Sequence, residues 1–535
     1  MFKGTKRKYL FFAIFAVNSI LIYFILLKLR ILMLGWDTVF HLNRIEELSQ
    51  SIRNGHLFAS SGTYAFSHVG QANNIFYPYL FLYPFAVARL IFNPINAYNT
   101  VLLLSTFCSF LISYHCIRIV VKQYNHTLSE NIGFWFSIIY NNSSYLVLQP
   151  TNRGDIAEYV ALILLPAVFC GFEYLAINRT YLWLFLPFGL SLVAYSHFLS
   201  VCIFSFFLAF LLLVYYKRIN KLVIVRLFFS VLIFVLCVLP LVIPIYRLKN
   251  RTNILLPAIS KSLFISALTP SDLFLNSLNN QVPLNVHGTN VGFIILMITI
   301  FSICKVVCND QSMDEVLRKK GILFLSIGIT FCFFSTNLFP WFLFNGTPLR
   351  IIQFPWRFLG PATFCLAYSG SIFIQHLAVN KIVRSLFIAG TMFLSVVYVY
   401  SYVSMSKAYC HDYEIKKYKD ISANSKNGDY MSIGELNNIH QQYAWNKKKA
   451  IYNNIVNVNG KSIHLNSDRI KFSYNKVTYH ITNLRKGENI VKLPLNNYGF
   501  NHTNYGTIEA DHIGNTVVRF YSNNSTKNIT IKLNN

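Results

Sequence analysis

Long apolar runs, separated by short polar or basic segments, dominate the chain up to residue 405. A run of about 20 apolar residues is long enough for one helix to cross a bilayer. The stretch 181–216 is nearly twice that length, and the polar pair Ser196-His197 in its middle is the predicted turning point. The pattern predicts eleven membrane-spanning helices, at residues 9–27, 101–121, 132–148, 156–177, 181–195, 198–216, 222–246, 291–307, 321–338, 358–379 and 382–403.

The segment 75–92 is also apolar, but Pro78, Pro84 and Arg89 interrupt it. We predict that it is a re-entrant or interfacial element and does not span. The loops between the other spans then gather their basic residues on one side, which the positive-inside rule makes cytoplasmic. This arrangement predicts a cytoplasmic N-terminus and an extracytoplasmic C-terminus. It rests on Lys3, Lys6, Arg7, Lys8, Arg118, Lys122, Arg179, Lys217, Arg218, Lys221, Arg226, Lys305, Arg318, Lys319, Lys320, Lys381 and Arg384.

The pattern changes after residue 405, where the chain becomes rich in Asn, Lys, Ser and Tyr. Apolar residues alternate with polar ones at 470–474, 477–481 and 529–533, which is typical of strands with one buried face. Asn459-Gly460 is a favourable hairpin turn. We therefore predict an all-α polytopic domain followed by a small extracytoplasmic β-sandwich. The predicted boundaries are 1–405 for the membrane domain, with outer loops 28–97 and 247–289, then 406–460 for a stalk and 461–535 for the sandwich.

Composition excludes most other classes of protein. The 535 residues are 54% hydrophobic and 13% charged, whereas about a quarter of a typical soluble domain is charged. The net charge of +27 is explained by membrane topology and attraction to anionic lipid. No nucleic-acid recognition motif accompanies it, so we expect no nucleic-acid partner. A P-loop, a dinucleotide-binding motif, a zincin motif and a nucleophile elbow are also absent from the sequence.

Carboxylates are rare before residue 406, so each one on the predicted outer side is a candidate for chemistry. Asp37 follows the first span, and a helix over 38–54 would place His41 and Arg44 on the same face as Asp37. A carboxylate, an imidazole and a guanidinium would then line up at the membrane surface. Taken alone, this stretch slightly favours the alternative that Asp37 is the N-cap of a surface helix.

A second cluster lies in the outer loop before the fourth span. Here Arg153, Asp155 and Glu158 fall within six residues of one another. The two acids fit a functional site, but they also fit a helix cap paired with Arg153, and we keep both interpretations. His197, at the outer turn between spans five and six, is a weaker candidate.

A third cluster is basic and aromatic, with Arg350, Trp356 and Arg357 at the outer start of the tenth span. Arginine forks bind phosphate with two hydrogen bonds, so this cluster suits a phosphate ligand. The alternative is snorkelling arginines beside an aromatic belt.

Taken together and in this order, these motifs resemble a family of bacterial membrane proteins labelled 6-pyruvoyl-tetrahydropterin synthase-related. That family is akin to the YfhO-like proteins and to the wider GT-C glycosyltransferase superfamily. Trp36 stands where the family is expected to have His, and Ala59 where it is expected to have proline. The matching stretches are Gly35-Trp-Asp-Thr-Val-Phe-His-Leu-Asn-Arg-Ile, Asn74-Ile-Phe-Tyr-Pro-Tyr-Leu, Arg153-Gly-Asp-Ile-Ala-Glu, Ser196-His-Phe-Leu-Ser and Gln353-Phe-Pro-Trp-Arg-Phe, with a looser match at Leu493-Pro-Leu-Asn-Asn-Tyr.

The resemblance implies an enzyme of the bacterial plasma membrane that takes a sugar from a polyprenyl-phosphate donor. The acceptor would be a cell-envelope polymer or glycolipid on the outer face. Asp37 would be the general base and Asp155 would orient the acceptor or stabilise the oxocarbenium-like centre. Arg350 and Arg357, with Arg153, would hold the departing phosphate. The candidate catalytic residues are Asp37 and Asp155, and the candidate substrate-binding residues are His41, Arg44, Arg153, Glu158, His197, Arg350, Trp356 and Arg357.

Two other functions remain open from the sequence. One is a non-catalytic lipid or polysaccharide transporter, in which the same charges line a path. The other is an envelope scaffold that holds polymer with its β domain. The sequence indicates no metal cofactor, although a divalent metal would be compatible with the carboxylates, and it does not identify the sugar or the acceptor.

Overall fold

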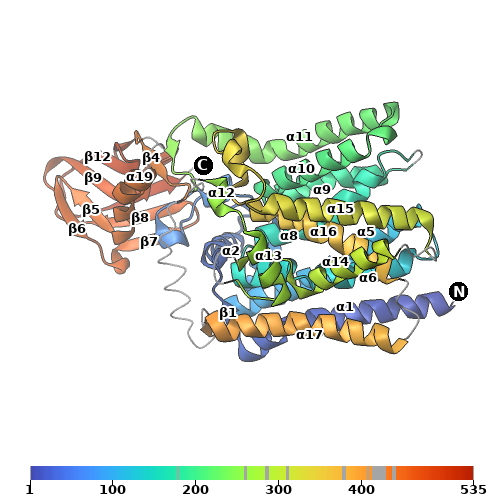
Figure 1. The fold of residues 1–535 in the computed structure, drawn as a ribbon. Coiled ribbons are helices and arrows are strands. Elements are labelled where there is room, and N and C mark those ends of the chain that lie inside the picture. The colour runs from blue at the N-terminus through green and yellow to red at the C-terminus, as the bar shows by residue number, and fades with distance from the viewer. Residues whose placement is uncertain are drawn as a thin grey trace. The chain divides into compact units, whose positions relative to one another are not determined.

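The computed structural model (Figure 1) describes residues 2–177, 180–257, 262–283, 288–308, 313–375, 381–406, 409–411, 429–436 and 441–533. The chain divides into two compact units, each built from separate stretches of sequence. Unit 1 comprises 1–37, 98–238 and 259–411, and unit 2 comprises 38–97, 239–258 and 412–535.

Unit 1 is helical, and each apolar run predicted to span falls on one or two helices. Among the described residues, five helices are long and apolar enough to cross a membrane, which is the character of an integral membrane protein. These five include the predicted first and last spans. The principal helices are α1 (Phe2–Leu29), α5 (Pro94–Lys122), α6 (Ser129–Asn141), α7 (Ser144–Leu148), α8 (Ile156–Glu173), α9 (Phe185–Ala194), α10 (Phe198–Val214), α11 (Lys221–Lys249), α12 (Leu263–Ser266), α13 (Pro270–Leu278), α14 (Gly292–Val307), α15 (Glu315–Ser335), α16 (Leu359–Ile374) and α17 (Lys381–Ser406).

Aromatic packing forms the core of unit 1. Helix α16 is buried along its whole length and lies against α6, α14 and α15, as Figure 1 shows for α15. Phe169 of α8 and Phe364 of α16 meet with ring centres 5.0 Å apart, in an edge-to-face arrangement. The predicted break at Ser196-His197 is confirmed, because α9 ends at Ala194 and α10 begins at Phe198.

Two of the cations predicted to lie in cytoplasmic loops are buried instead. Lys320 is 5% exposed, and its Nζ lies 3.0 Å from the carboxylate of Glu173 on α8. Arg226 is 8% exposed and donates to the carbonyl oxygens of Tyr174 and Leu175. Lys320 lies on α15 and neutralises the buried acid. Arg226 lies on α11 and satisfies carbonyl groups at the end of α8.

Unit 2 begins with α2 (Thr38–Arg53), which confirms the predicted helix over 38–54. The apolar segment 75–92 contains no helix of spanning length. It is divided among α3 (Asn73–Phe76), η2 (Leu80–Leu82) and α4 (Tyr83–Ile91). Pro84 lies in the first turn of α4, where proline is tolerated because its missing N–H would have no helical partner.

The rest of unit 2 is largely a β-sandwich. One sheet has the order β11-β12-β9-β5-β6 and the other β10-β13-β8-β7, all antiparallel. Most of the alternating residues predicted to face inward are buried, among them Val477, Tyr479 and Ile531, whereas Phe472 and Tyr474 are only partly buried. The strands are β5 (Ile455–Val458), β6 (Lys461–His464), β7 (Ile470–Ser473), β8 (Lys476–Ile481), β9 (Gly487–Asn496), β10 (Asn501–Thr503), β11 (Thr507–Ala510), β12 (Asn515–Ser522) and β13 (Lys527–Leu533).

The predicted hairpin at Asn459-Gly460 is confirmed, since Val458 pairs with Lys461 across it. Both turn residues have positive φ, 51° and 89°, as a two-residue hairpin of this type requires. The sandwich therefore includes β5, which lies in the segment predicted to be a stalk. Much of that segment, including 412–428, lies outside the described residues.

Candidate functional site

The site begins at the turn before α8. A short π-helix, η3 (Gln149–Arg153), ends at Gly154, whose φ of 71° is left-handed and favours glycine. Asp155 then caps α8, because its Oδ1 accepts the N–H of Glu158 at 2.9 Å. The helix-cap interpretation of Asp155 is therefore confirmed, and its second carboxylate oxygen is left to interact elsewhere.

Arg153 is the centre of a buried ion cluster. Its Nη2 lies 3.0 Å from Oδ2 of Asp155, and its Nη1 lies 2.5 Å from Oε2 of Glu158. All three side chains are 4–5% exposed. The predicted pairing of Arg153 with the two carboxylates is confirmed. One positive charge here faces two negative ones, so a second cation is needed to compensate the buried cluster.

A second guanidinium reaches the same carboxylate from a distant part of the chain. Arg357 lies on η9 (Pro355–Phe358), and its Nε is 3.4 Å from Oε2 of Glu158. Its Nη1 donates to the carbonyl of Ile352 and to Oε1 of Gln353, at 2.9 and 3.0 Å. Within the described part of the chain, no hydrogen bond is made by Nη2 of Arg357. Of the three guanidinium nitrogens, Nη2 is therefore the one that the described contacts leave unbonded.

Trp356 packs against both arginines. The guanidinium carbon of Arg153 lies 4.6 Å from the centre of the indole ring, and that of Arg357 lies 5.6 Å from it. These are cation–π distances. Trp356 is only 1% exposed, so it is not part of an aromatic belt at the membrane interface. Arg357 is only 6% exposed, so its guanidinium does not snorkel into water.

Asp37 contributes the third carboxylate. Its backbone N–H donates to the carbonyl oxygen of Arg153 at 2.8 Å, and its Oδ2 lies 3.9 Å from Nε of Arg153. Its side chain is 44% exposed, in contrast to the buried Asp155 and Glu158. Asp37 is therefore the accessible carboxylate of the cluster.

The electrostatic environment of Asp37 favours its neutral form more than water does. Although the side chain keeps part of its contact with solvent, the protein packed around it removes much of its hydration. This desolvation, with the added repulsion of Asp155, raises the pKa of Asp37 to about 6, while Arg153 and Arg357 act in the opposite direction. A carboxyl group with a pKa near 6 can both take up and release a proton near neutral pH.

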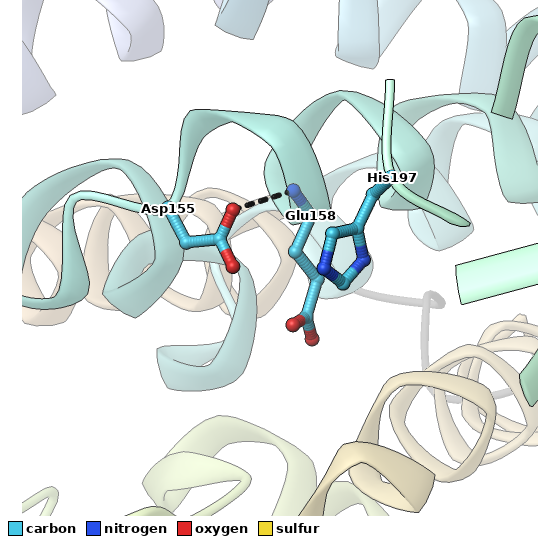
Figure 2. Close-up of side chains that lie close together, drawn as sticks. All are labelled: Asp155, Glu158 and His197. Carbon is cyan, nitrogen blue, oxygen red and sulfur yellow. Dashed lines mark hydrogen bonds between the residues drawn. The ribbon is translucent and has the colours of Figure 1, made fainter. Parts of the chain in front are cut away.

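His197 brings an imidazole to the two buried carboxylates. It precedes α10, and its Nδ1 lies 2.8 Å from Oγ of Ser200. Figure 2 shows its ring beside the side chain of Glu158, with Asp155 bonded to the amide of Glu158. Burial lowers the pKa of His197 to about 4, so the imidazole is neutral at physiological pH.

Asp155, Glu158 and His197 are also the residues best placed to hold a metal ion. One ligand atom from each lies within 4.8 Å of the others, and a neutral imidazole with two carboxylates is a donor set that suits zinc. However, both carboxylates are already paired with Arg153. A dication would have to displace that guanidinium, so the residues present fit an arginine better than a metal.

The structure brings seven of the ten predicted site residues together in unit 1. These are Asp37, Arg153, Asp155, Glu158, His197, Trp356 and Arg357.

Of the other three predicted residues, one belongs to unit 1 and two belong to unit 2. Arg350 lies half-buried on η8 (Pro348–Ile352), and Arg357 is the arginine that meets Glu158. His41 and Arg44 belong to unit 2, where both are buried. Arg44 donates to Oδ1 of Asn74 at 2.9 Å and to the carbonyl oxygens of Tyr77 and Pro78. These contacts fix the segment that precedes α4.

Three further residues of the site were not predicted from the sequence. Tyr145 donates its hydroxyl to Oε1 of Glu158 at 2.8 Å. Gln149 accepts a hydrogen bond from Arg153, and Gln353 accepts one from Arg357. The position of Gln353 in the stretch Gln353-Phe-Pro-Trp-Arg was a usable signal, whereas nothing in the sequence distinguishes Tyr145 from other tyrosines of the apolar runs.

Comparison with family models, with curated proteins and with solved structures finds no match for this chain. The function is therefore argued from the geometry of the site.

Proposed function

We propose that the chain is a membrane glycosyltransferase of the GT-C type. It would move a sugar from a polyprenyl-phosphate donor to a cell-envelope acceptor on the outer face of the bacterial plasma membrane. The proposal includes eleven spans, a cytoplasmic N-terminus and an extracytoplasmic unit 2.

One observation carries the proposal: an accessible carboxylate, Asp37, lies at the edge of a buried cluster that contains two arginines. The exposed carboxylate offers a base with a pKa near 6, and Arg357 offers a guanidinium nitrogen to an anion. Transfer of a sugar from a lipid phosphate needs these two functions, a proton acceptor for the incoming hydroxyl and a positive group for the leaving phosphate.

In this mechanism the acceptor hydroxyl gives its proton to Asp37 as its oxygen bonds to the anomeric carbon. The bond between that carbon and the phosphate oxygen breaks, and the electron pair leaves with the phosphate. Arg357 stabilises the charge that develops there, since charge-assisted bonds to phosphate are among the strongest in proteins. Arg153 holds Asp37 and Asp155 in place, and Glu158 fixes both arginines.

The experiment is a glycan analysis of the cell envelope by mass spectrometry. Cells that lack the gene are complemented with wild type, with Asp37→Asn or with Asp272→Asn, a control at a helix start outside the cluster. We expect a sugar substituent to disappear in the deletion strain and to return with wild type and with Asp272→Asn, but not with Asp37→Asn at equal protein level. Full restoration by Asp37→Asn would refute the role of Asp37.

The main rival is a non-catalytic transporter or scaffold, in which the ion cluster only ties distant segments of unit 1 together. The buried contacts of Arg153 with Asp155 and Glu158 favour this rival, because a buried ion network also fits a purely structural role. It predicts that the deletion strain loses polymer or lipid export without losing any single sugar linkage.

A further inference from the structure

The sheet β10-β13-β8-β7 of unit 2 has one face in the sandwich core and one outward polar face. Strand alternation sends Val477, Tyr479 and Ile481 of β8 inward, and it sends Lys476, Thr478 and His480 outward. The neighbouring strands contribute Lys471 from β7 and Asn528 from β13 to the same outward face.

This face carries a hollow of about 370 Å³. Cavities of this size accept small ligands or one repeat of a polymer. All the side chains that line the hollow are polar: Asp468, Arg469, Lys471, Thr478, His480 and Asn528. A lipid-inserting surface carries aromatic or aliphatic side chains, so a bilayer is not the ligand that this lining fits.

Cross-strand hydrogen bonds hold the lining in place. Nδ1 of His480 lies 2.8 Å from Oδ1 of Asn528, and the Thr478 hydroxyl bonds that of Thr530 at 3.0 Å. This contact occupies Nδ1 of His480 and leaves Nε2 of the ring to meet a ligand. The carboxylate of Asp468 is an acceptor in the hollow, and both groups suit hydroxyl groups of a ligand.

The positive charge of this part of unit 2 indicates that the ligand also carries a negative group. Residues 441–535 contain thirteen Lys and Arg against four Asp and Glu. Arg469 and Lys471 place two of these cations in the hollow itself. The hollow thus combines hydrogen-bond acceptors, which suit the hydroxyl groups of a ligand, with two cations, which suit a negative group. A molecule that carries both kinds of group matches this lining.

We propose that this hollow binds a repeat unit of an anionic, hydroxyl-rich polymer. The phosphodiester or carboxylate group would lie against Arg469 and Lys471, and the hydroxyls against Asp468, His480 and Asn528. The binding site goes beyond the proposed transferase function and does not depend on it, because all its residues belong to unit 2.

The test measures binding of poly(glycerol phosphate) to the full-length protein in detergent, by calorimetric titration. Arg469→Gln with Lys471→Gln removes both cations, and we expect affinity to fall roughly tenfold or more. The matched control, Lys461→Gln with Lys486→Gln, removes the same charge from exposed positions outside the hollow. We expect it to bind like wild type, and a thermal melt verifies that each variant is folded.

Two further probes separate the sources of negative charge. Inorganic polyphosphate has charge without hydroxyls, and we expect it to bind more weakly than poly(glycerol phosphate). Vesicles of anionic lipid test the membrane as a ligand. Three results would each overturn the proposal. These are no binding of the polymer, an equal loss of affinity in the two double variants, or vesicle binding that depends on Arg469 and Lys471 as strongly as polymer binding does.

Discussion

The amide of Asp37 donates a hydrogen bond to the carbonyl oxygen of Arg153, at 2.8 Å. This bond joins the segment that follows the first predicted span to the turn before α8. Gly35 makes the approach possible. A Cβ on Gly35 would lie 2.5 Å from the carbonyl oxygen of Asn152 and 2.7 Å from the carbonyl carbon of Arg153, so any larger residue would force the two backbones apart.

Gly35→Ala should therefore displace Asp37 from Arg153 without removing a charge. A shift of about 1 Å at a catalytic group costs roughly 100-fold in rate, so we expect sugar transfer to fall by about that factor. The control is Gly346→Ala, where a Cβ would meet nothing within 4 Å. The measurement is the transfer rate in membranes, with protein level followed by immunoblot. Wild-type transfer by Gly35→Ala would show that the contact does not position the base.

Glu158→Gln tests the stability of the ion cluster. The substitution leaves Arg153 and Arg357 with less compensation in a buried site, and breaking a buried ion pair costs about 3–5 kcal/mol. We expect a lower melting temperature of the detergent-solubilised protein and less protein in the membrane. Glu315→Gln, which breaks an exposed pair with Lys319, should leave both unchanged. Equal melting of Glu158→Gln and wild type would mean that the arginines do not need this carboxylate.

A separate prediction for unit 2 concerns Lys448, which we expect to stabilise the turn at 511–515. Its side chain is buried, and Nζ donates to the carbonyl oxygens of Ile513 and Gly514 and to Oδ1 of Asn515, at 3.2, 2.9 and 2.7 Å. Lys448→Ala leaves these acceptors without their donor, at a cost of about 2–3 kcal/mol.

We expect limited proteolysis of full-length Lys448→Ala to cut near the turn at 511–515 more readily than in wild type. Lys449→Ala, at the exposed neighbouring position, is the control. Equal cleavage of both variants and wild type would show that the turn holds its conformation without Lys448.

The helices were predictable because they coincide with long apolar runs. Strands β8 and β13 were predictable because every second residue is apolar and buried. The predicted start of the sandwich at 461 was too late, although the hairpin turn at Asn459-Gly460 was recognised. A hairpin turn requires a strand on each side, so the turn itself indicated β5 (Ile455–Val458).

The cluster around Arg153 was predictable in part, because charged residues are rare in apolar segments and so stand out. The resemblance grouped Arg357 with Arg153 at one phosphate. The contact between Arg357 and Glu158 was not predicted, since these two residues lie far apart in sequence. Arg44 shows the same difficulty. Its partners, Asn74 and the carbonyl groups of Tyr77 and Pro78, depend on how the chain returns to α2.

The proposed mechanism predicts a pH dependence of transfer, because the pKa of Asp37 is raised. Only the ionised carboxylate accepts a proton, so a pKa of about 6 predicts little transfer near pH 5, a rise through pH 6 and a plateau above about pH 7. The measurement is the initial rate of transfer in membranes across this range, with membrane-bound protein verified as intact at each pH. Arg153→Lys keeps the positive charge but changes its geometry, and we expect the midpoint to move while the plateau falls. A midpoint near pH 6 would be assigned to Asp37, since no other carboxylate described in the cluster is comparably exposed. A rate independent of pH between about 5 and 8 would exclude Asp37 as the base, because its ionisation would then not be required.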